Sequence, residues 1–275
     1  MDIKPVIVVH GGAWAIPDDL AESSKTGVKN AATHGFSILS DGGSSLEAVE
    51  AAVRILEDDT AFDAGHGAVL NADGDVELDA IIMDGKNLAV GAVSCIKNIA
   101  HPVTFARTIM EQTPHVMLTG SGANTFAEEM KIEKVPTEEL VTLNAVKEWE
   151  QYQKYKQSVT SLFNTERTHD TVGAVAIDSK GNVSCATSTG GITNKMVGRV
   201  GDSPIIGETP KSAADHALEY MKERVHGRGG LIVISKSGEW AARFSTKRMA
   251  WASAENNILT YGLNPGEKFQ EKICL

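Results

Sequence analysis

The first sixty residues carry two hydrophobic periods, and each period predicts a different kind of element. Residues 5–9 (PVIVV) form a continuous apolar run, which predicts a buried strand running into His10-Gly11-Gly12. Apolar residues then recur at helical spacing over 20–39 and stop before Asp41-Gly42-Gly43. Ser44, followed three residues later by Glu47, predicts a capping box at the start of a second amphipathic helix over 44–59.

The rest of the chain predicts further strands and helices around one charged segment. We expect strands at AVLN (68–71), VELDAIIM (76–83) and LAVGAVSCI (88–96), and helices over 102–112 and 122–131. Residues 132–168 are charged and weakly periodic, so we interpret them as a mobile linker containing some helix. A helix over about 210–225 and strands at LIVIS, EWAARFS and ILTYG follow. This order indicates layered sheets with helices outside.

The two arms TVGAVAID and NVSCATST predict a hairpin that brings two threonines together. Its turn is Ser179-Lys180-Gly181, where glycine supplies the positive φ. If the turn centres on Lys180, paired positions sum to 360, and Thr171 faces Thr189 to within one residue. Two β-favouring threonines at strand ends would give the same pattern without any chemistry.

Further features favour a catalytic interpretation of this hairpin. The linker ends at Thr171, so the chain could be cut there without breaking an element. A threonine at a new N-terminus carries its own base, since its α-amine titrates near ~7.7–8. In the glycine-rich loop that follows, Arg199 and Asp202 could bind the carboxylate and the ammonium of an amino acid. A surface salt bridge is the alternative interpretation of that pair.

Composition restricts the partners and the compartment. The 275 residues carry a net charge of -10, which argues against nucleic acid. Three widely spaced cysteines do not suggest a disulfide framework, and no apolar run has the length of a membrane span or the form of a signal peptide. We therefore predict a cytoplasmic protein.

The chain resembles the plant-type asparaginase/isoaspartyl peptidase family of N-terminal nucleophile hydrolases, particularly its cytosolic animal members. The motifs that carry this resemblance are VVHGGA (8–13), LEDD (56–59), FDAGHGAVLNADGDVELDA (62–80), MDG (83–85), TVGAVAID (171–178), GNVSCATSTGG (181–191) and NKMVGRVGDSPIIG (194–207). The resemblance implies an α/β fold, a four-layer αββα sandwich, in a single domain over 1–275. It also implies self-cleavage into an α-subunit (1–170, with a linker over about 132–170) and a β-subunit (171–275).

The same resemblance implies a role for each residue of the site. The scissile bond is Asp170–Thr171, and the mature nucleophile is the Thr171 hydroxyl, with its own amine as general base. Thr189 is the supporting hydroxyl. Substrate contacts come from the run Arg199, Val200, Gly201 and Asp202. The substrate is L-asparagine or a β-aspartyl dipeptide, no cofactor takes part in catalysis, and the enzyme is a dimer of cleaved αβ pairs.

A structural sodium ion is also implied by the resemblance, in the loop between Leu56 and His66. Its ligands would be backbone carbonyls, which suit a hard cation. They belong to Leu56, Glu57, Asp59, Phe62, Ala64 and His66. Relatives often have Asn where this chain has Asp63, so we assign that side chain no role. His10 has no second His or Cys at ligand spacing, which argues against a transition-metal site.

The family pattern breaks after Gly207, where a strand ending in Thr-Gly-x-Gly and a helix are expected. Here Gly207 runs directly into Glu208-Thr209-Pro210, so the sandwich would lack one strand and one helix. The missing Thr-Gly supplies oxyanion donors, and losing one such donor typically costs ~10²–10³ in rate. Thr119-Gly120-Ser121-Gly122 has the same letters but lies before the linker, and we do not expect it to replace them. The alternatives are an active hydrolase, an impaired internally deleted isoform, and a glycosylasparaginase-like hydrolase.

Overall fold

The computed structural model describes residues 3–155, 171–201, 218 and 227–273. The helices are α1 (Ala21–Ser40), α2 (Ser45–Asp58), α3 (Pro102–Gln112), α4 (Gly120–Glu129), α5 (Thr137–Leu140) and α6 (Leu143–Tyr155). The strands are β1 (Val6–Trp14), β2 (Leu78–Asp84), β3 (Ala89–Ile96), β4 (Met117–Thr119), β5 (Val172–Ile177), β6 (Val183–Thr189), β7 (Gly230–Ile234), β8 (Trp240–Phe244), β9 (Arg248–Glu255), β10 (Ile258–Gly262) and β11 (Phe269–Lys272).

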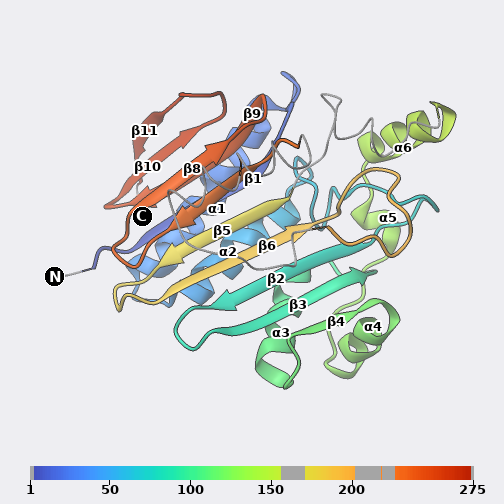
Figure 1. The fold of residues 1–275 in the computed structure, drawn as a ribbon, viewed down its shortest axis with the longest axis horizontal. Coiled ribbons are helices and arrows are strands. Elements are labelled where there is room, and N and C mark those ends of the chain that lie inside the picture. The colour runs from blue at the N-terminus through green and yellow to red at the C-terminus, as the bar shows by residue number, and fades with distance from the viewer. Residues whose placement is uncertain (1–2, 156–170, 202–217, 219–226, 274–275) are drawn as a thin grey trace.

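Nine of these strands form one large sheet in the order β11-β10-β9-β1-β5-β6-β2-β3-β4 (Figure 1). Neighbouring strands are antiparallel except for the short β3–β4 pair. The hairpin β5–β6 therefore lies in the middle of the sheet, between β1 and β2, so that its end residues are held from both sides.

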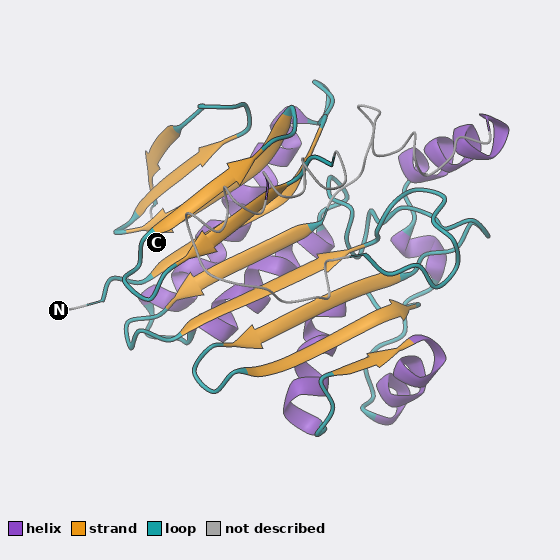
Figure 2. Cartoon of the chain, in the orientation of Figure 1, coloured by secondary structure: helices purple, strands orange, loops and turns teal. Residues whose placement is uncertain are grey.

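Helices α1, α2 and α3 cover one face of the large sheet, behind it in the view of Figure 2. In α1, Val28, Ala31, Ala32 and Phe36 are buried at helical spacing, which produces a single apolar stripe. In α2 the Ser44 hydroxyl accepts a hydrogen bond from the Glu47 N–H, and the Glu47 carboxylate accepts one from the Ser44 N–H. The predicted capping box is therefore confirmed.

The opposite face of the sheet carries a second, smaller core. Val6 and Val8 of β1 pack there with Ile232 of β7 and with Met249 and Trp251 of β9. Strands β7 and β8 form a separate two-stranded sheet over this core. The described residues thus make a mixed α/β fold of helices, a large sheet and a small sheet. This agrees with the α/β class that the sequence predicts.

Several sequence predictions were wrong, and one lies outside the described residues. Residues 68–71 (AVLN) are a buried loop and not a strand, because their N–H groups bond to loops and side chains, such as Val69 N to Asp63 Oδ1 at 3.0 Å. Strands β4, β9 and β11 were not predicted. The helix expected over 210–225 lies outside the described residues, except for Leu218.

The first part of the charged segment, residues 132–155, is more ordered than we predicted. Helix α6 docks through Trp149, whose Nε1 donates to Asn71 O at 2.7 Å, and through Gln153, whose Nε2 donates to Asn194 Oδ1 at 3.0 Å. Asn194 belongs to the loop after β6. The first part of the predicted linker, up to α6, is therefore tied to the glycine-rich loop beside the hairpin.

Candidate active site at the end of the central hairpin

The predicted register of the central hairpin is confirmed. Strands β5 and β6 pair from Val172↔Ser188 to Ile177↔Val183, so each pair sums to 360. Gly181 has a φ of +80°, and the Asp178 carboxylate holds the turn by accepting N–H bonds from Lys180 and Asn182. Thr171 immediately precedes Val172, and Thr189 immediately follows Ser188. The two threonines therefore lie on opposite strands at the same end of the hairpin.

Thr189 is the more buried of the two threonines. It is 2% exposed, and its Oγ1 accepts a hydrogen bond from Gly191 N at 2.9 Å. Thr171 is half-buried and lies immediately before β5. Asp170, the other half of the expected scissile bond, lies outside the described residues.

His10 lies next to this pair on the same face of the sheet. It pairs with Gly173 of β5, and an added Cβ on Gly173 would lie 2.6 Å from His10 Nε2. Only glycine therefore leaves room for the ring. The His10 Nδ1 accepts a hydrogen bond from Gly12 N at 3.3 Å, and burial lowers the pKa of His10 to about 4. The ring is therefore a neutral, packed side chain of β1, and it lies opposite Gly173, two residues after Thr171.

Arg199 extends from the loop after β6 back to the end of that strand. A Cβ added to Gly191 would lie 3.4 Å from Arg199 Nη1, and one added to Gly201 would lie 2.9 Å from the same atom. The guanidinium therefore packs against both glycines. Val200, the next residue, is 39% exposed. Asp202, the second arm of the expected clamp, lies outside the described residues. The structure thus brings Arg199 beside the residue whose N–H holds Thr189.

Three buried charged residues at this site were missed by the sequence analysis. Glu77 and Asp79 are 3% and 0% exposed, and Lys195 is 1% exposed. Lys195 Nζ donates to Glu77 O at 2.8 Å, and Gly198 N donates to Glu77 Oε2 at 3.1 Å. The start of β2 therefore anchors the loop that carries Arg199. The sequence signal for this buried charge was the alternation of Glu77 and Asp79 in VELD, which places both carboxylates on one face of a strand that is otherwise apolar.

Asp79 sits at an irregularity between β2 and β3. The register shifts between Leu78↔Ile96 and Ala80↔Val93, and Cys95 takes a φ of +52° there. This bulge directs Cys95 N to Asp79 Oδ1 at 2.9 Å. Burial raises the pKa of Asp79, while the positive charges of Lys195 and Arg199 oppose the rise.

Asp63 shapes the other side of the site. Its Oδ1 accepts a hydrogen bond from Val69 N at 3.0 Å, and its backbone oxygen accepts one from Gly190 N at 3.0 Å. The side chain, to which we assigned no role, therefore stabilises its own loop, while the backbone oxygen of Asp63 holds that loop against the end of β6.

Two glycines of the loop after α2 lie against backbone carbonyl oxygens. An added Cβ on Gly65 would lie 2.4 Å from Glu57 O and 2.6 Å from Ala100 O, and one on Gly67 would lie 2.6 Å from Phe62 O. Two residues of the predicted sodium set, Glu57 and Phe62, thus have carbonyl oxygens packed against glycines, and Glu57 O also accepts a hydrogen bond from His66 N at 2.7 Å. Backbone oxygens are the donors that a hard cation prefers. Among the described residues, no group of three His, Cys, Asp or Glu side chains could hold a metal ion.

The sequence Thr119-Gly120-Ser121-Gly122 is remote from the site, as expected. Thr119 ends β4 and Gly120 begins α4. Strand β4 is the edge of the large sheet and is separated from β6 by β2 and β3. It cannot supply oxyanion donors to Thr171 without a rearrangement of the sheet.

Comparisons with known proteins agree with these observations. A family model described as Asparaginase matches residues 3–209 and 207–263. An isoaspartyl peptidase/L-asparaginase of Xenopus laevis is 47% identical over 302 residues, covering 96% of this chain and 97% of the frog protein. The Homo sapiens protein of the same name is 45% identical over 303 residues, covering 96% and 98%. A probable isoaspartyl peptidase/L-asparaginase of Drosophila melanogaster is 34% identical, covering 99% of both chains.

The same comparisons contain an internal gap. The two matched segments of the family model meet at residues 207–209. The frog alignment spans 302 positions but includes 96% of 275 residues, about 264, so about 38 aligned positions have no counterpart in this chain. This length is close to the few dozen residues that the sequence pattern lacks after Gly207.

Proposed function

This chain belongs to the asparaginase family, and on that premise we propose that it is a self-cleaving threonine amidohydrolase acting on L-asparagine and on β-aspartyl dipeptides. The observation that carries the proposal is the position of Thr171. It stands at the head of β5, across the hairpin from the buried Thr189 hydroxyl, and Arg199 returns to the end of β6. The relatives named isoaspartyl peptidase/L-asparaginase support the substrate class.

The first step is cleavage of the Asp170–Thr171 bond. The Thr171 hydroxyl attacks the Asp170 carbonyl, and the C–N bond breaks as the acyl group moves from nitrogen to oxygen. Water then hydrolyses the ester, which leaves a carboxylate on Asp170 and a free α-amine on Thr171. The linker helix α6 is bonded to Asn194.

In the mature site the Thr171 amine takes the proton of its own hydroxyl. The oxygen attacks the side-chain amide carbonyl of the substrate, ammonia or the second amino acid leaves, and water hydrolyses the acyl-enzyme. Thr189 donates to the nucleophile, since its oxygen already accepts from Gly191 N. Arg199 receives the α-carboxylate with two parallel hydrogen bonds, and we assign the α-ammonium to Asp202.

We assign the finer architecture on the same basis. The four-layer αββα sandwich, lacking one strand and one helix, extends the observed helix and sheet layers. The α-subunit is 1–170, with its linker over about 132–170, and the β-subunit is 171–275, together forming one domain that assembles as a dimer of αβ pairs. We place the enzyme in the cytoplasm. None of the described helices is long and apolar enough to cross a membrane.

A sodium ion would be held by the loop that follows α2. The backbone oxygens of Leu56, Glu57, Asp59, Phe62, Ala64 and His66 would form its ligand set. The ion would stabilise the loop, one residue of which, Asp63, accepts the hydrogen bond from Gly190 N at 3.0 Å. It supplies no chemistry to the reaction.

Substitution of Thr171 tests the proposal. Thr171→Ala should leave one uncut, inactive chain, whereas Thr171→Ser should retain some cleavage because the hydroxyl survives. Intact mass detects the two fragments, and ammonia release from L-asparagine measures turnover. If Thr171→Ala still separates between residues 170 and 171, the assignment of the nucleophile is wrong.

A second function is favoured by the internal gap. In this alternative, which we also propose for testing, the chain is an impaired, internally deleted isoform, because about 38 aligned positions of the frog relative have no counterpart here and the family match is divided at residues 207–209. The missing segment includes the expected oxyanion donors, worth ~10²–10³ in rate each. Loss of a strand from a central sheet would also leave backbone groups without partners.

Repair of the chain separates the two functions. Inserting the corresponding relative segment after Gly207 should raise melting temperature, self-cleavage and ammonia release together. A chain of 275 residues that equals the repaired chain in all three would show that the segment is dispensable.

A further inference from the structure

Asp79 places a buried negative charge directly across the sheet from Thr189. The two residues are paired between β2 and β6. Asp79 is fully buried, and although its Oδ1 accepts from Cys95 N at 2.9 Å, its Oδ2 has no hydrogen-bond partner among the described residues. A buried carboxylate oxygen without a hydrogen bond needs another source of stabilisation.

Lys195 supplies the complementary charge. Its ammonium is almost fully buried and donates to the Glu77 carbonyl oxygen at 2.8 Å. Lys195 forms no ion pair with a carboxylate in the described part of the chain, but its positive charge opposes the rise that burial causes in the pKa of Asp79. Asp79 and Lys195 are thus buried groups of opposite charge at the same end of β6, and the charge of Lys195 favours the ionised form of Asp79 without a direct ion pair.

Lys195 and Arg199 meet at Gly191. A Cβ on Gly191 would lie 3.2 Å from Lys195 Nζ and 3.4 Å from Arg199 Nη1. Gly191 also donates its N–H to Thr189 Oγ1 at 2.9 Å. Two cations thus lie beside the one residue that positions the supporting hydroxyl, and a buried anion nearby offsets their mutual repulsion.

We propose that Asp79 and Lys195 are a positioning pair that holds the loop of Arg199 against the end of β6. Asp79 offsets the repulsion between the two cations, and Lys195 ties the loop to the start of β2. Neither residue touches the substrate; both act through Arg199. This inference rests on the proposed function for the identity of the bound group, an α-carboxylate.

The pair should influence ground-state binding more than chemistry. Displacement of the guanidinium weakens capture of the carboxylate, whereas the Thr171 hydroxyl and amine stay in β5. Asp79→Asn and Lys195→Met should each raise KM for L-asparagine by ~10-fold, within the range of couplings between neighbouring charges. The fall in kcat should stay below ~3-fold.

A double-mutant cycle tests the coupling. Asp79→Asn combined with Lys195→Met removes both charges, and a neutral pair is tolerated better than one unpaired ion. The double variant should therefore have a KM no higher than that of the worse single variant.

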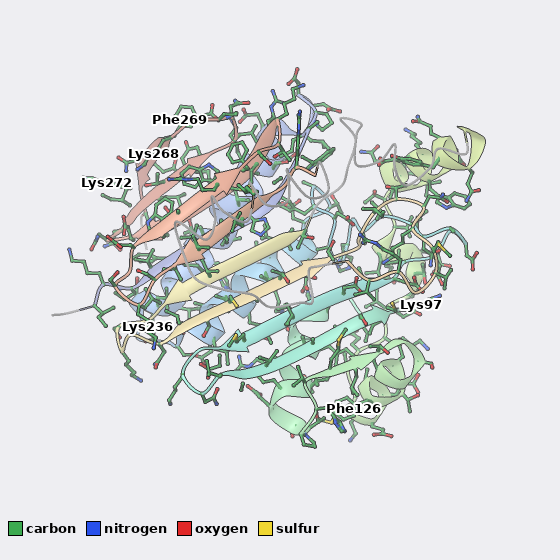
Figure 3. All side chains as sticks on the ribbon, viewed as in Figure 1. Lys97, Phe126, Lys236, Lys268, Phe269 and Lys272 are labelled. Carbon is green, nitrogen blue, oxygen red and sulfur yellow. The ribbon has the colours of Figure 1, made fainter. Side chains whose placement is uncertain are left out.

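A second Asp–Lys pair in the structure provides the control for this cycle. Lys97, at the end of β3 in Figure 3, donates to Asp75 Oδ2 at 2.6 Å, and both side chains are about one-third exposed. Partly exposed pairs are worth ~0–1 kcal/mol. Asp75→Asn and Lys97→Met should change KM less than ~3-fold.

Binding of L-aspartate provides a second measurement that needs no turnover. L-Aspartate should raise the melting temperature of the wild type and raise that of each single variant much less. Multiplicative KM effects in the cycle, or full protection of Lys195→Met by L-aspartate, would overturn the pairing. If Asp79→Asn fails to fold, Lys195→Met alone decides. A wild type that binds L-aspartate without releasing ammonia would refute the proposed function and leave this test intact.

Discussion

The buried ring of His10 predicts a loss of stability in mild acid. Its side chain is 8% exposed, and burial lowers its pKa from an ordinary 6.5 to about 4. The unfolded chain therefore takes up a proton below pH 6.5, whereas the folded chain does so only near pH 4. The stabilisation is complete above pH 6.5 and is lost as the pH falls through this window.

The size of the effect follows from the same two values. At ~1.4 kcal/mol per pH unit, the interval from 6.5 to about 4 corresponds to ~3 kcal/mol in the free energy of unfolding. Of this, ~2 kcal/mol should be lost between pH 7 and pH 5. This is a large share of the stability of an ordinary domain.

The assay compares the wild-type residue with His10→Asn. The asparagine side-chain oxygen can still accept the hydrogen bond from Gly12 N but takes up no proton. Urea unfolding at pH 7 and pH 5 is measured in a Thr171→Ala background, so that an uncut chain unfolds in one step. The chain with His10 should lose ~2 kcal/mol more than His10→Asn between the two pH values.

A matched substitution controls for the change of residue type. His34 lies exposed on α1, and His34→Asn should respond to pH as the parent chain does. If His10→Asn loses as much stability as its parent between pH 7 and pH 5, then His10 is not buried as a neutral ring, and the reasoning fails.

Two further predictions concern binding and packing. Arg199→Lys should weaken L-aspartate binding by ~10-fold or more, because a point charge cannot reproduce a bidentate fork; equal thermal protection of variant and wild type would remove Arg199 from the site. Gly11→Ala should destabilise the fold by ~1–3 kcal/mol, because the added Cβ would lie 2.1 Å from Phe62 Cε1. Gly122→Ala in α4, with no atom within 4 Å of the added Cβ, should be neutral or stabilising by up to ~1 kcal/mol, and similar melting temperatures for the two would contradict this packing.

Local patterns in the sequence predicted the elements that depend on neighbouring residues. The capping box of α2 needs only Ser44 and Glu47, and both hydrogen bonds are present. The hairpin register needs only a period of two and a short turn, so the position of Thr171 relative to Thr189 could be predicted to within one residue. The run AVLN has the same apolar character, but its partners are distant loops, and it is not a strand.

The sequence by itself determined the hairpin, the main helices and the motif that places Arg199 after Thr189. Only the tertiary structure decided that β9 pairs with β1, and that Asp79, Lys195 and Gly191 meet at the end of β6. The physical reason is that backbone pairing and charge burial are set by residues far apart in the chain. Carboxylates at alternate strand positions predict a solvent-exposed face of the strand, and only the neighbouring strand and loop show that these are buried.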